Sequence, residues 1–420
     1  MIKLHNIEKI KEISNKKNYK SDKELFGEVF TPFYFIHSIF KIFPENIFKN
    51  PNLKWLDPGS GTGNFSIYLY FKLLDSLSHE ILNEHDRKEH IINNMIYIVE
   101  YREENVKILK EIFGVKANII NIDFLEYNPS HNFDVIIGNP PFNFNGQKKV
   151  PTNSKNNKKQ DGQTIWIEFM KHSISLLKEN GYLNMFIPSI WLKPDKEKMY
   201  YYLLKYNIQY LNCFSNTETN KIFKGNAQTP SCYFLLKKEK NPGIITIFDK
   251  DCNRYIDFRL KPNIPIPLSN IEIVNDFQEQ LKKYKHIDVI KTNLPPKGIS
   301  LSPSKLGNHI YPNIRTRLLK NEELIIEYSN KPLFGYGKSK LVLANKMYGL
   351  PYLDLSGEYG ISNRDNYVIY KENNEDLIRL SEFLSTELVK KVYESTRYRM
   401  KYLEKYAFEL LPDITSSFPS

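Results

Sequence analysis

The residues best suited to chemistry stand together as Asn139-Pro140-Pro141-Phe142, directly after the apolar run DVIIG. Such a run predicts a strand, which would present the four residues at its carboxyl end. Two consecutive prolines fix φ and stiffen the turn. The Asn139 side chain and the Pro140 carbonyl would then be two fixed acceptors beside the Phe142 ring. This arrangement suits a planar exocyclic amine, although a plain surface turn would also explain the four residues.

A second candidate site is the glycine-rich loop DPGSGTG, which runs from Asp57 to Gly63. Its glycines allow a tight turn and a close approach to a ligand, with backbone amides at the following helix start. An ordinary strand-to-helix turn is the alternative. No Gly-Lys-Ser/Thr follows, so the loop is not a phosphate-binding P-loop. The next strand-end acid, Glu100, lies 43 positions after Asp57, where the dinucleotide fingerprint expects about 20.

The elements around these residues predict an open α/β sheet. One strand ends at Asp57 and is followed by a helix from about Asn64; another ends at Glu100 and is followed by a helix containing Val106 and Leu109. The runs ANIINIDFLEY and FDVIIGNPPFN predict two more strands. Strands alternating with helices indicate a mostly parallel sheet with its site along the carboxyl edge.

Composition excludes a disordered chain and a small scaffold. The 420 residues include 59 Lys and Arg against 48 Asp and Glu, and 41% are hydrophobic. The net charge of +11 favours a nucleic-acid partner over a membrane, because no polybasic run adjoins an apolar helix. A solvated lysine-rich surface is the alternative explanation.

Nothing in the sequence predicts secretion, membrane insertion or metal binding. The amino terminus lacks the apolar region of a signal peptide, and no run of about 18 apolar residues occurs, so we expect a soluble cytoplasmic protein. Cys213, Cys232 and Cys252 form no CxxC pair. We therefore predict neither a disulfide framework nor a metal site, and expect three small buried hydrophobes.

Several segments, taken in order, resemble the gamma-class N6-adenine DNA methyltransferases of restriction-modification systems, TaqI-like and related to the methylase parts of type IIG enzymes. The similarity covers about residues 26–240 and includes GQTIWIEFMKHSISLLKENGYLNMFIPSIWL and KIFKGNAQTPSCYFLLKK. The matching positions are Gly27 to Pro32 for motif X, Asp57 to Phe65 for motif I, Glu100 for motif II, Asp123-Phe124 for motif III, and Asn139 to Phe142 for catalytic motif IV.

The resemblance implies a Rossmann-like, S-adenosylmethionine-dependent methyltransferase domain. Glu100 would accept hydrogen bonds from the ribose hydroxyls, Asp123 would accept from the cofactor's adenine amino group, and Phe124 would lie against that ring. For each acid alone, an ordinary solvated carboxylate is the alternative. The residues implied around the methionine part and the sulfonium are Thr31, Pro32, Asp57, Gly59, Gly61 and Gly63.

The resemblance also implies how the turn from Asn139 to Phe142 would act. The adenine amine must become pyramidal before it attacks the methyl group, and acceptors at Asn139 and Pro140 favour that change. A base within a duplex cannot reach such a cleft, so the enzyme would flip it and stack it on Phe142. Phe223 is a candidate second aromatic contact, with core packing as the alternative.

Three regions follow along the chain: an N-terminal helical extension at 1–25, the catalytic domain at 26–240, and a mixed α+β DNA target-recognition domain at 241–420. KKEKNPGI marks the last boundary, and basic, aromatic and proline-rich segments follow it. The polar stretch at 145–162 predicts a mobile loop near the catalytic turn, either gripping DNA or simply disordered.

Other readings stay open: an RNA adenine-N6 or protein glutamine-N5 methyltransferase with the same turn, or a non-catalytic DNA-binding scaffold. About 25 residues precede Gly27, fewer than the roughly 50 of the smallest usual domain, so we expect no N-terminal nuclease. The expected enzyme is a monomer that acts on double-stranded DNA, with a separately encoded restriction endonuclease as a partner. The DNA sequence that it recognises follows from no motif.

Overall fold

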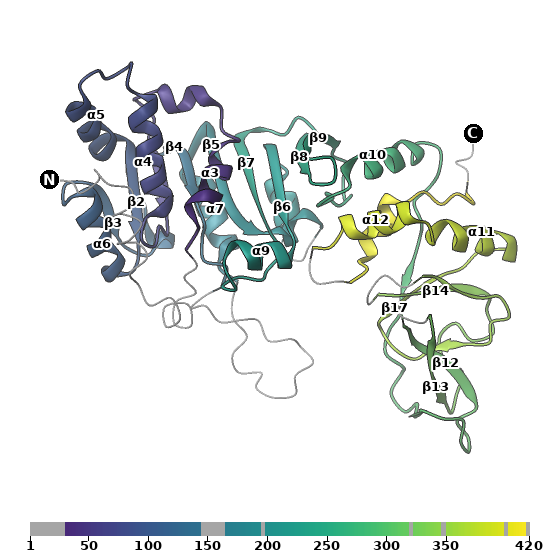
Figure 1. Cartoon of the computed structure of the whole chain (residues 1–420). Coiled ribbons are helices and arrows are strands. Elements are labelled where there is room, and N and C mark those ends of the chain that lie inside the picture. Colours follow the sequence, from purple (N-terminus) through teal and green to yellow (C-terminus); the bar gives the residue numbers. More distant parts are fainter. Residues whose placement is uncertain are drawn as a thin grey trace. The chain divides into compact units, whose positions relative to one another are not determined.

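The computed structural model describes residues 30–143, 164–194, 198–318, 322–345, 350–398 and 402–416. These residues divide into two compact units (Figure 1), the first within 1–191 and 195–246, the second within 192–194 and 247–420. The first unit ends inside β8 (Ile244–Asp249), whereas the sequence predicted a domain boundary at residue 240. Three predicted segments lie outside the described residues: the extension at 1–25, residues 27–29 of the Gly27 motif, and the loop at 145–162.

The first unit contains a sheet in which seven strands follow the order β3-β2-β1-β4-β5-β7-β6. Strand β7 is antiparallel to β5 and β6, whereas the other neighbouring pairs are parallel. The predicted α/β class and mostly parallel sheet are therefore confirmed. The strands are β1 (Trp55–Pro58), β2 (Ile96–Glu100), β3 (Asn118–Asn121), β4 (Phe133–Gly138), β5 (Leu177–Pro188), β6 (Tyr206–Phe214) and β7 (Ser231–Lys240).

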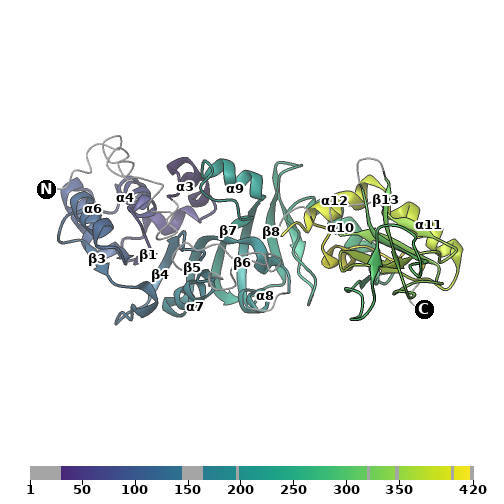
Figure 2. The same cartoon turned by 90° about the horizontal axis from the view of Figure 1, so that it is seen from below.

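Helices cover both faces of this sheet, which explains why β1 is buried along its whole length and β4 is buried at every residue except Asp134. Figure 2 shows α3, α4 and α9 on one face and α7 and α8 on the other. Between α4 and Glu100 lies α5, continued by a π-helical turn at Ile91–Met95. The helices are α3 (Phe33–Phe40), α4 (Asn64–Ser76), α5 (Glu84–His90), α6 (Glu103–Phe113), α7 (Trp166–Leu176), α8 (Met199–Leu203) and α9 (Asn216–Ile222), with short 3-10 turns at Glu45–Lys49, Phe124–Glu126 and Ser189–Leu192.

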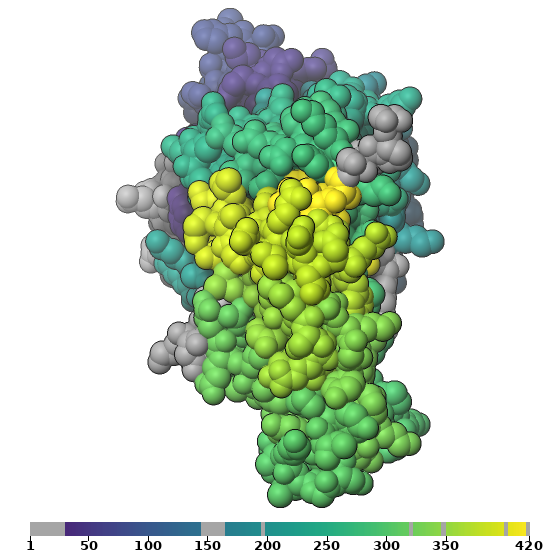
Figure 3. All heavy atoms as spheres, turned by 90° about the vertical axis from the view of Figure 1, so that its right-hand side faces the viewer, coloured from purple at the N-terminus to yellow at the C-terminus, as the bar shows by residue number. Residues whose placement is uncertain are grey.

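Among its described residues, the second unit contains two four-stranded sheets and three α-helices, so its structure is mixed α and β. One sheet has the order β10-β17-β14-β15 and the other β11-β13-β12-β16. In Figure 3 the green β11–β13 region forms the narrow end of this unit, away from its yellow carboxyl-terminal helices. Its strands are β9 (Arg254–Arg259), β10 (Ile290–Lys291), β11 (Leu301–Ser302), β12 (Tyr311–Arg317), β13 (Leu324–Ser329), β14 (Lys340–Ala344), β15 (Tyr352–Asp354), β16 (Gly360–Ile361) and β17 (Asn366–Ile369), and its helices are α10 (Ile271–Gln280), α11 (Asn374–Leu384), α12 (Glu387–Ser395) and a 3-10 turn at Lys405–Leu410.

The environments of the cysteines differ from one another. Cys213 and Cys232 are buried as predicted, but Cys252 is exposed, and its Sγ lies 3.1 Å from Glu272 Oε2. The prediction for Cys252 is wrong because this residue lies in the exposed turn between β8 and β9.

Within the described ranges, no helix is both long and apolar enough to cross a membrane.

The last glycine of the predicted ligand loop is required by packing. Gly63 has φ +87°, and a Cβ there would lie 2.5 Å from Leu109 Cδ2 of α6. Gly225 is a matched control, because its φ is +86° and a Cβ there would meet nothing within 4 Å.

Gly63→Ala is therefore expected to cost about 1–3 kcal/mol more of the free energy of unfolding than Gly225→Ala, since both pay for positive φ but only the first overpacks α6. Urea unfolding of the two variants measures the difference. Equal destabilisation would show that Leu109 moves aside freely.

Candidate active site

The predicted site residues meet at the carboxyl edge of β1, β2 and β4. In the parallel register Asp57 pairs with Ile98 and Leu56 pairs with Ile136, so the ends of the three strands lie together. A Cβ at Gly138 would lie 3.4 Å from Asp57 Oδ1. The acid that begins the glycine loop and the turn that begins at Asn139 are thus neighbours, although 82 positions separate them in the sequence.

Backbone hydrogen bonds fold the glycine loop onto the end of β2. The amides of Gly59 and Ser60 donate to the Val99 carbonyl at 2.9 and 3.1 Å. Gly59 and Gly61 have φ of +71° and +57°, a region that favours glycine. A Cβ at Gly59 would lie 3.3 Å from the Phe169 ring and 3.8 Å from Pro141. The loop therefore passes between α7 and the proline turn.

Glu100 holds this loop in place. Its Oε2 accepts from the Gly61 amide at 2.7 Å, and its Oε1 accepts from the Arg102 amide at 2.9 Å and from Asn105 Nδ2 at 3.2 Å. The carboxylate is buried. Each of its oxygens can accept more than one hydrogen bond, so the predicted ribose contact is compatible with these bonds. The clamping of the loop is a role that the sequence did not indicate.

Three buried polar atoms of the loop have no hydrogen-bond partner within the described part of the chain: Ser60 Oγ, Thr62 Oγ1 and Asn64 Oδ1. Buried polar groups are usually hydrogen-bonded, so a group of three at one loop is expected to bind a polar ligand. A polar small molecule with several donors and acceptors fits this arrangement. The sequence analysis missed these residues, although the Ser, Thr and Asn around the glycines were a visible signal.

Asp57 is buried and accepts a hydrogen bond from Ser66 Oγ at 2.7 Å. Burial raises the pKa of its carboxyl from the ordinary 3.8 to about 7, with the Ser66 hydrogen bonds opposing this shift and the charge of Glu100 adding to it. Near neutral pH, Asp57 is therefore partly protonated and partly ionised, and a positively charged ligand nearby would favour the ionised form.

This pKa has a consequence for stability. Between about pH 4 and pH 7 the folded state holds the Asp57 proton and the unfolded state has lost it, so the free energy of unfolding falls as pH rises through this range. In Asp57→Asn this contribution is absent.

We therefore expect the free energy of unfolding of Asp57→Asn, taken relative to that of the wild type, to rise by about 4 kcal/mol between pH 4 and pH 7. The rise corresponds to about 1.4 kcal/mol per pH unit. Urea unfolding of both proteins at several pH values measures this. A constant difference would mean that Asp57 titrates normally.

The predicted pair that follows β3 lies on the other side of the loop. Asp123 begins the 3-10 turn at Phe124–Glu126, and its Oδ1 accepts from the Leu125 amide at 3.0 Å. The Phe124 ring is buried, with centroids 5.1 Å from Phe169 and 4.8 Å from His172. Phe169 therefore contacts both Phe124 and the Gly59 loop, and the sequence analysis did not single it out.

The turn at 139–142 is anchored at both ends. Asn139 Nδ2 donates to Thr31 Oγ1 at 3.1 Å, and the Phe142 carbonyl accepts from the Ile165 amide at 3.1 Å. The half-buried Phe142 ring stacks on Phe186 of β5, with centroids 6.2 Å apart and planes 29° apart. The structure thus brings Thr31, which precedes α3, to the turn at 139–142 as well as to Asn64 at the end of the glycine loop.

Phe223 is buried, unlike the half-buried Phe142. It is 3% exposed and packs against Phe35 and Phe186, with centroids 6.1 and 5.3 Å apart. Phe186 contacts both Phe142 and Phe223 and so links the two predicted stacking residues. Core packing, the alternative left open by the sequence, describes the position of Phe223 here.

In the described ranges, no group of three or more His, Cys, Asp or Glu residues could hold a metal ion.

Comparison with known proteins places this site in context. Residues 60–223 match the family model of the Eco57I restriction-modification methylase. The type II restriction enzyme and methyltransferase RM.Eco57I of Escherichia coli is 30% identical over 145 residues, covering 32% of this chain and 14% of that protein. RM.MjaORFECS2P of Methanocaldococcus jannaschii is 28% identical over 292 residues, covering 64% of this chain and 21% of that protein. The chain spans about a fifth or less of the length of these relatives.

Among solved structures, the M protein of the type I restriction enzyme EcoKI shares 18% identity at a TM-score of 0.39, over 54% of this chain and 49% of that one. A nuclease-deletion mutant of the type ISP enzyme LlaGI, in complex with a DNA substrate mimic, shares 14% identity at a TM-score of 0.43, over 69% and 29%.

The matched segment runs from the glycine loop through the Asn139 turn to Phe223, and so contains most of the motifs that suggested the resemblance. The resemblance to restriction-modification methylases is thereby confirmed for this segment. Residues 60–223 of the chain are thus similar to the methylases of the Eco57I restriction-modification family.

Proposed function

We propose that this chain is a site-specific DNA adenine-N6 methyltransferase that uses S-adenosylmethionine and serves as the modification enzyme of a restriction-modification system. The observation that carries the proposal is the Asn139 turn, held by Thr31 beside a glycine loop in which three buried polar atoms have no partner among the described residues. The match of residues 60–223 to a methylase family supports it.

The loop residues suit the cofactor. Ser60, Thr62 and Asn64 each have a polar atom without a partner among the described residues. Glu100 offers acceptor capacity for hydroxyl groups, and Asp57 offers a carboxylate for positive charge. When bound, S-adenosylmethionine supplies an electrophilic methyl group on a sulfonium. The residues that would hold it are those predicted from the sequence, with Ser60, Thr62 and Asn64 added.

The turn at 139–142 acts on the target amine. The nitrogen lone pair of adenine's amino group is delocalised into the ring, so this nitrogen reacts only when it becomes pyramidal. Asn139 Oδ1 and the Pro140 carbonyl accept from the two N–H groups and favour that geometry. Because both acceptors belong to a rigid turn, they need little reorganisation during the reaction.

A target adenine must leave the duplex to reach this turn. The Phe142 ring is half-buried and is supported from beneath by Phe186, so its orientation is fixed before a base arrives. A preorganised ring loses little side-chain entropy when a base stacks on it. Phe223 supports Phe186 from within the core and contributes to the stacking site indirectly.

The second unit is proposed to bind double-stranded DNA. Residues 289–321 contain six Lys or Arg and no Asp or Glu. Within this unit, Lys297, Lys305 and Lys331 are exposed, and none makes an ion pair with another described residue. Unpaired cations on neighbouring segments are typical of surfaces that neutralise phosphates.

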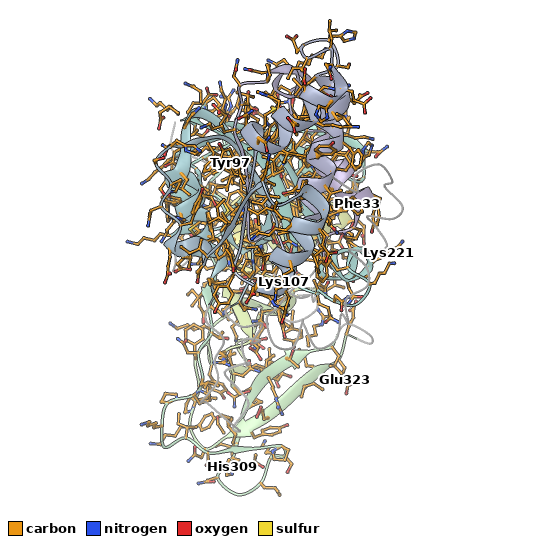
Figure 4. The ribbon with its side chains drawn as sticks, turned by 90° about the vertical axis from the view of Figure 1, so that its left-hand side faces the viewer. Phe33, Tyr97, Lys107, Lys221, His309 and Glu323 are labelled. Atoms are coloured by element: carbon orange, nitrogen blue, oxygen red, sulfur yellow. The ribbon has the colours of Figure 1, made fainter. Side chains whose placement is uncertain are left out.

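These three lysines come from segments that hydrogen-bond to one another. The Ser300 amide donates to Asn330 Oδ1 at 3.2 Å, and Ser300 Oγ lies 2.8 Å from His309 Nε2. We call this region, with the exposed Leu301, Leu306 and Ile310, the tip surface. Figure 4 shows His309 of the tip surface and Glu323 at opposite ends of the β12–β13 pair. The tip surface combines cations and apolar side chains, which suits a DNA groove with phosphates on either side.

The test is transfer of a tritiated methyl group to DNA, RNA and protein side by side, followed by digestion and identification of the labelled product. The proposal requires N6-methyladenine in DNA at a defined sequence. Label in RNA adenine or protein glutamine would replace it with the corresponding alternative, and no label in any substrate would favour a non-catalytic scaffold.

A further inference from the structure

The Thr31 hydroxyl is a side-chain partner of the Asn139 amide. Its Oγ1 accepts from Asn139 Nδ2 at 3.1 Å, joining two residues 108 positions apart. Thr31 is 4% exposed, so water competes little for this hydrogen bond. Hydrogen bonds in a water-excluded site are electrostatically stronger than at the surface.

The backbone of Thr31 is itself held. Its carbonyl accepts from Asn64 Nδ2 at 2.9 Å, and Asn64 is the first residue of α4, directly after the glycine loop. The next carbonyl, that of Pro32, accepts from the Phe35 and Ile36 amides at 3.0 Å and begins α3. Phe35 and Ile36 are buried. The hydroxyl is therefore held between two elements that the core fixes.

This arrangement sets the orientation of a planar group. With Nδ2 bonded to Thr31, Oδ1 is turned away from Thr31 and remains the acceptor of the amide. The reaction proposed above needs an acceptor at this position, because a rotated amide would present N–H groups to the N–H groups of the amine. We infer that Thr31 is a positioning residue that holds Asn139 in its accepting orientation. This inference rests on the proposed function.

This role differs from the one that the resemblance implied for Thr31, which was a place beside the cofactor's methionine. The two roles make different kinetic predictions. A residue that only holds the cofactor changes its dissociation constant and leaves kcat at saturation unaltered. A residue that positions Asn139 changes kcat at saturating cofactor and leaves the dissociation constant nearly unaltered.

The decisive variant is Thr31→Val, which keeps the shape of the side chain and removes the hydroxyl. We expect kcat for DNA methylation at saturating S-adenosylmethionine to fall about 10- to 100-fold, and the cofactor's dissociation constant from calorimetry to change less than about threefold. Thr31→Ser restores a hydroxyl and should return kcat to within about threefold of the wild type. Thr31→Ala removes the hydroxyl without adding strain and should reproduce the loss.

Thr219→Val is the matched control. Thr219 is fully buried in the same unit, and its hydroxyl has no partner among the described residues, so its loss should leave kcat unchanged. If Thr31→Val or Thr31→Ala keeps the wild-type kcat, or if Thr31→Ser is as slow as Thr31→Val, the positioning role is wrong. Failure of the proposed function shows separately, because the wild-type protein would then not methylate DNA.

Discussion

Asn139→Ala is expected to lower the rate of methyl transfer to DNA by about 100- to 1000-fold while leaving S-adenosylmethionine binding nearly intact. In the proposed function the substitution removes an acceptor that acts on the target amine, and loss of one preorganised hydrogen-bonding group at a reacting centre typically costs this much. The glycine loop keeps its own contacts, since the Gly59, Ser60 and Gly61 amides are held by Val99 and Glu100. Single-turnover methylation and calorimetry measure the two effects separately.

Asn128→Ala is the control for this variant. Asn128 is exposed and makes a local hydrogen bond from Nδ2 to the Glu126 carbonyl at 3.1 Å, so its removal tests a general effect of losing an asparagine from the same unit. If the turnover of Asn139→Ala stays within about tenfold of the wild type, Asn139 contributes at most about 1.4 kcal/mol of transition-state stabilisation. That result would falsify its role as an acceptor.

Replacing Lys297, Lys305 and Lys331 together by Ala should weaken binding to target DNA several-hundredfold at about 0.1 M salt. Removing one lysine that neutralises a phosphate is expected to lower the slope of log affinity against log salt by about 0.9, so the three together would remove about 2.7. These lysines have no described ion pairs, and the segment that carries two of them lacks acids, so their charges are available to phosphates. Fluorescence anisotropy over about 50 to 200 mM salt gives the slope.

The control is a second triple variant in the same unit. Lys283, Lys285 and Lys391 are also exposed and make no described ion pair, but lie at or beside α10 and α12, outside the tip surface. Their replacement by Ala changes the net charge by the same amount and should leave the slope almost unchanged. Equal effects of the two triples would show that DNA responds only to total charge, and that the tip surface is not where the second unit binds it.

Much of the first unit is local in origin and was predictable from the sequence. The strand that ends at Pro58, the helix from Asn64, and the strands that end at Glu100 and Gly138 lie where apolar runs and glycine turns placed them. Parallel strands buried on both faces are continuous apolar runs, and their carboxyl ends must share one edge. The meeting of Asp57, Glu100 and Asn139 follows from that rule.

The sequence could not show which groups face one another across that edge. The hydrogen bond from Asn139 to Thr31, the clamp from Glu100 to Gly61, and the position of Phe169 between Gly59 and Phe124 all join segments far apart in the chain. Contacts of this kind depend on the distance between elements and on side-chain rotamers, neither of which leaves a periodic signal.

The aromatic residues and the pKa of Asp57 illustrate the same division. Phe142 and Phe223 are both aromatic residues in matching motifs, but β5 places Phe186 between them, so one ring is half-buried at the site and the other lies in the core. Asp57 is an ordinary carboxylate by type, and it is chiefly its burial in the folded protein that raises its pKa to about 7. Residue types and their spacing determined the chemistry available to this protein, whereas packing decided which side chains remain accessible and in which charge state, because burial and orientation are properties of the assembled core.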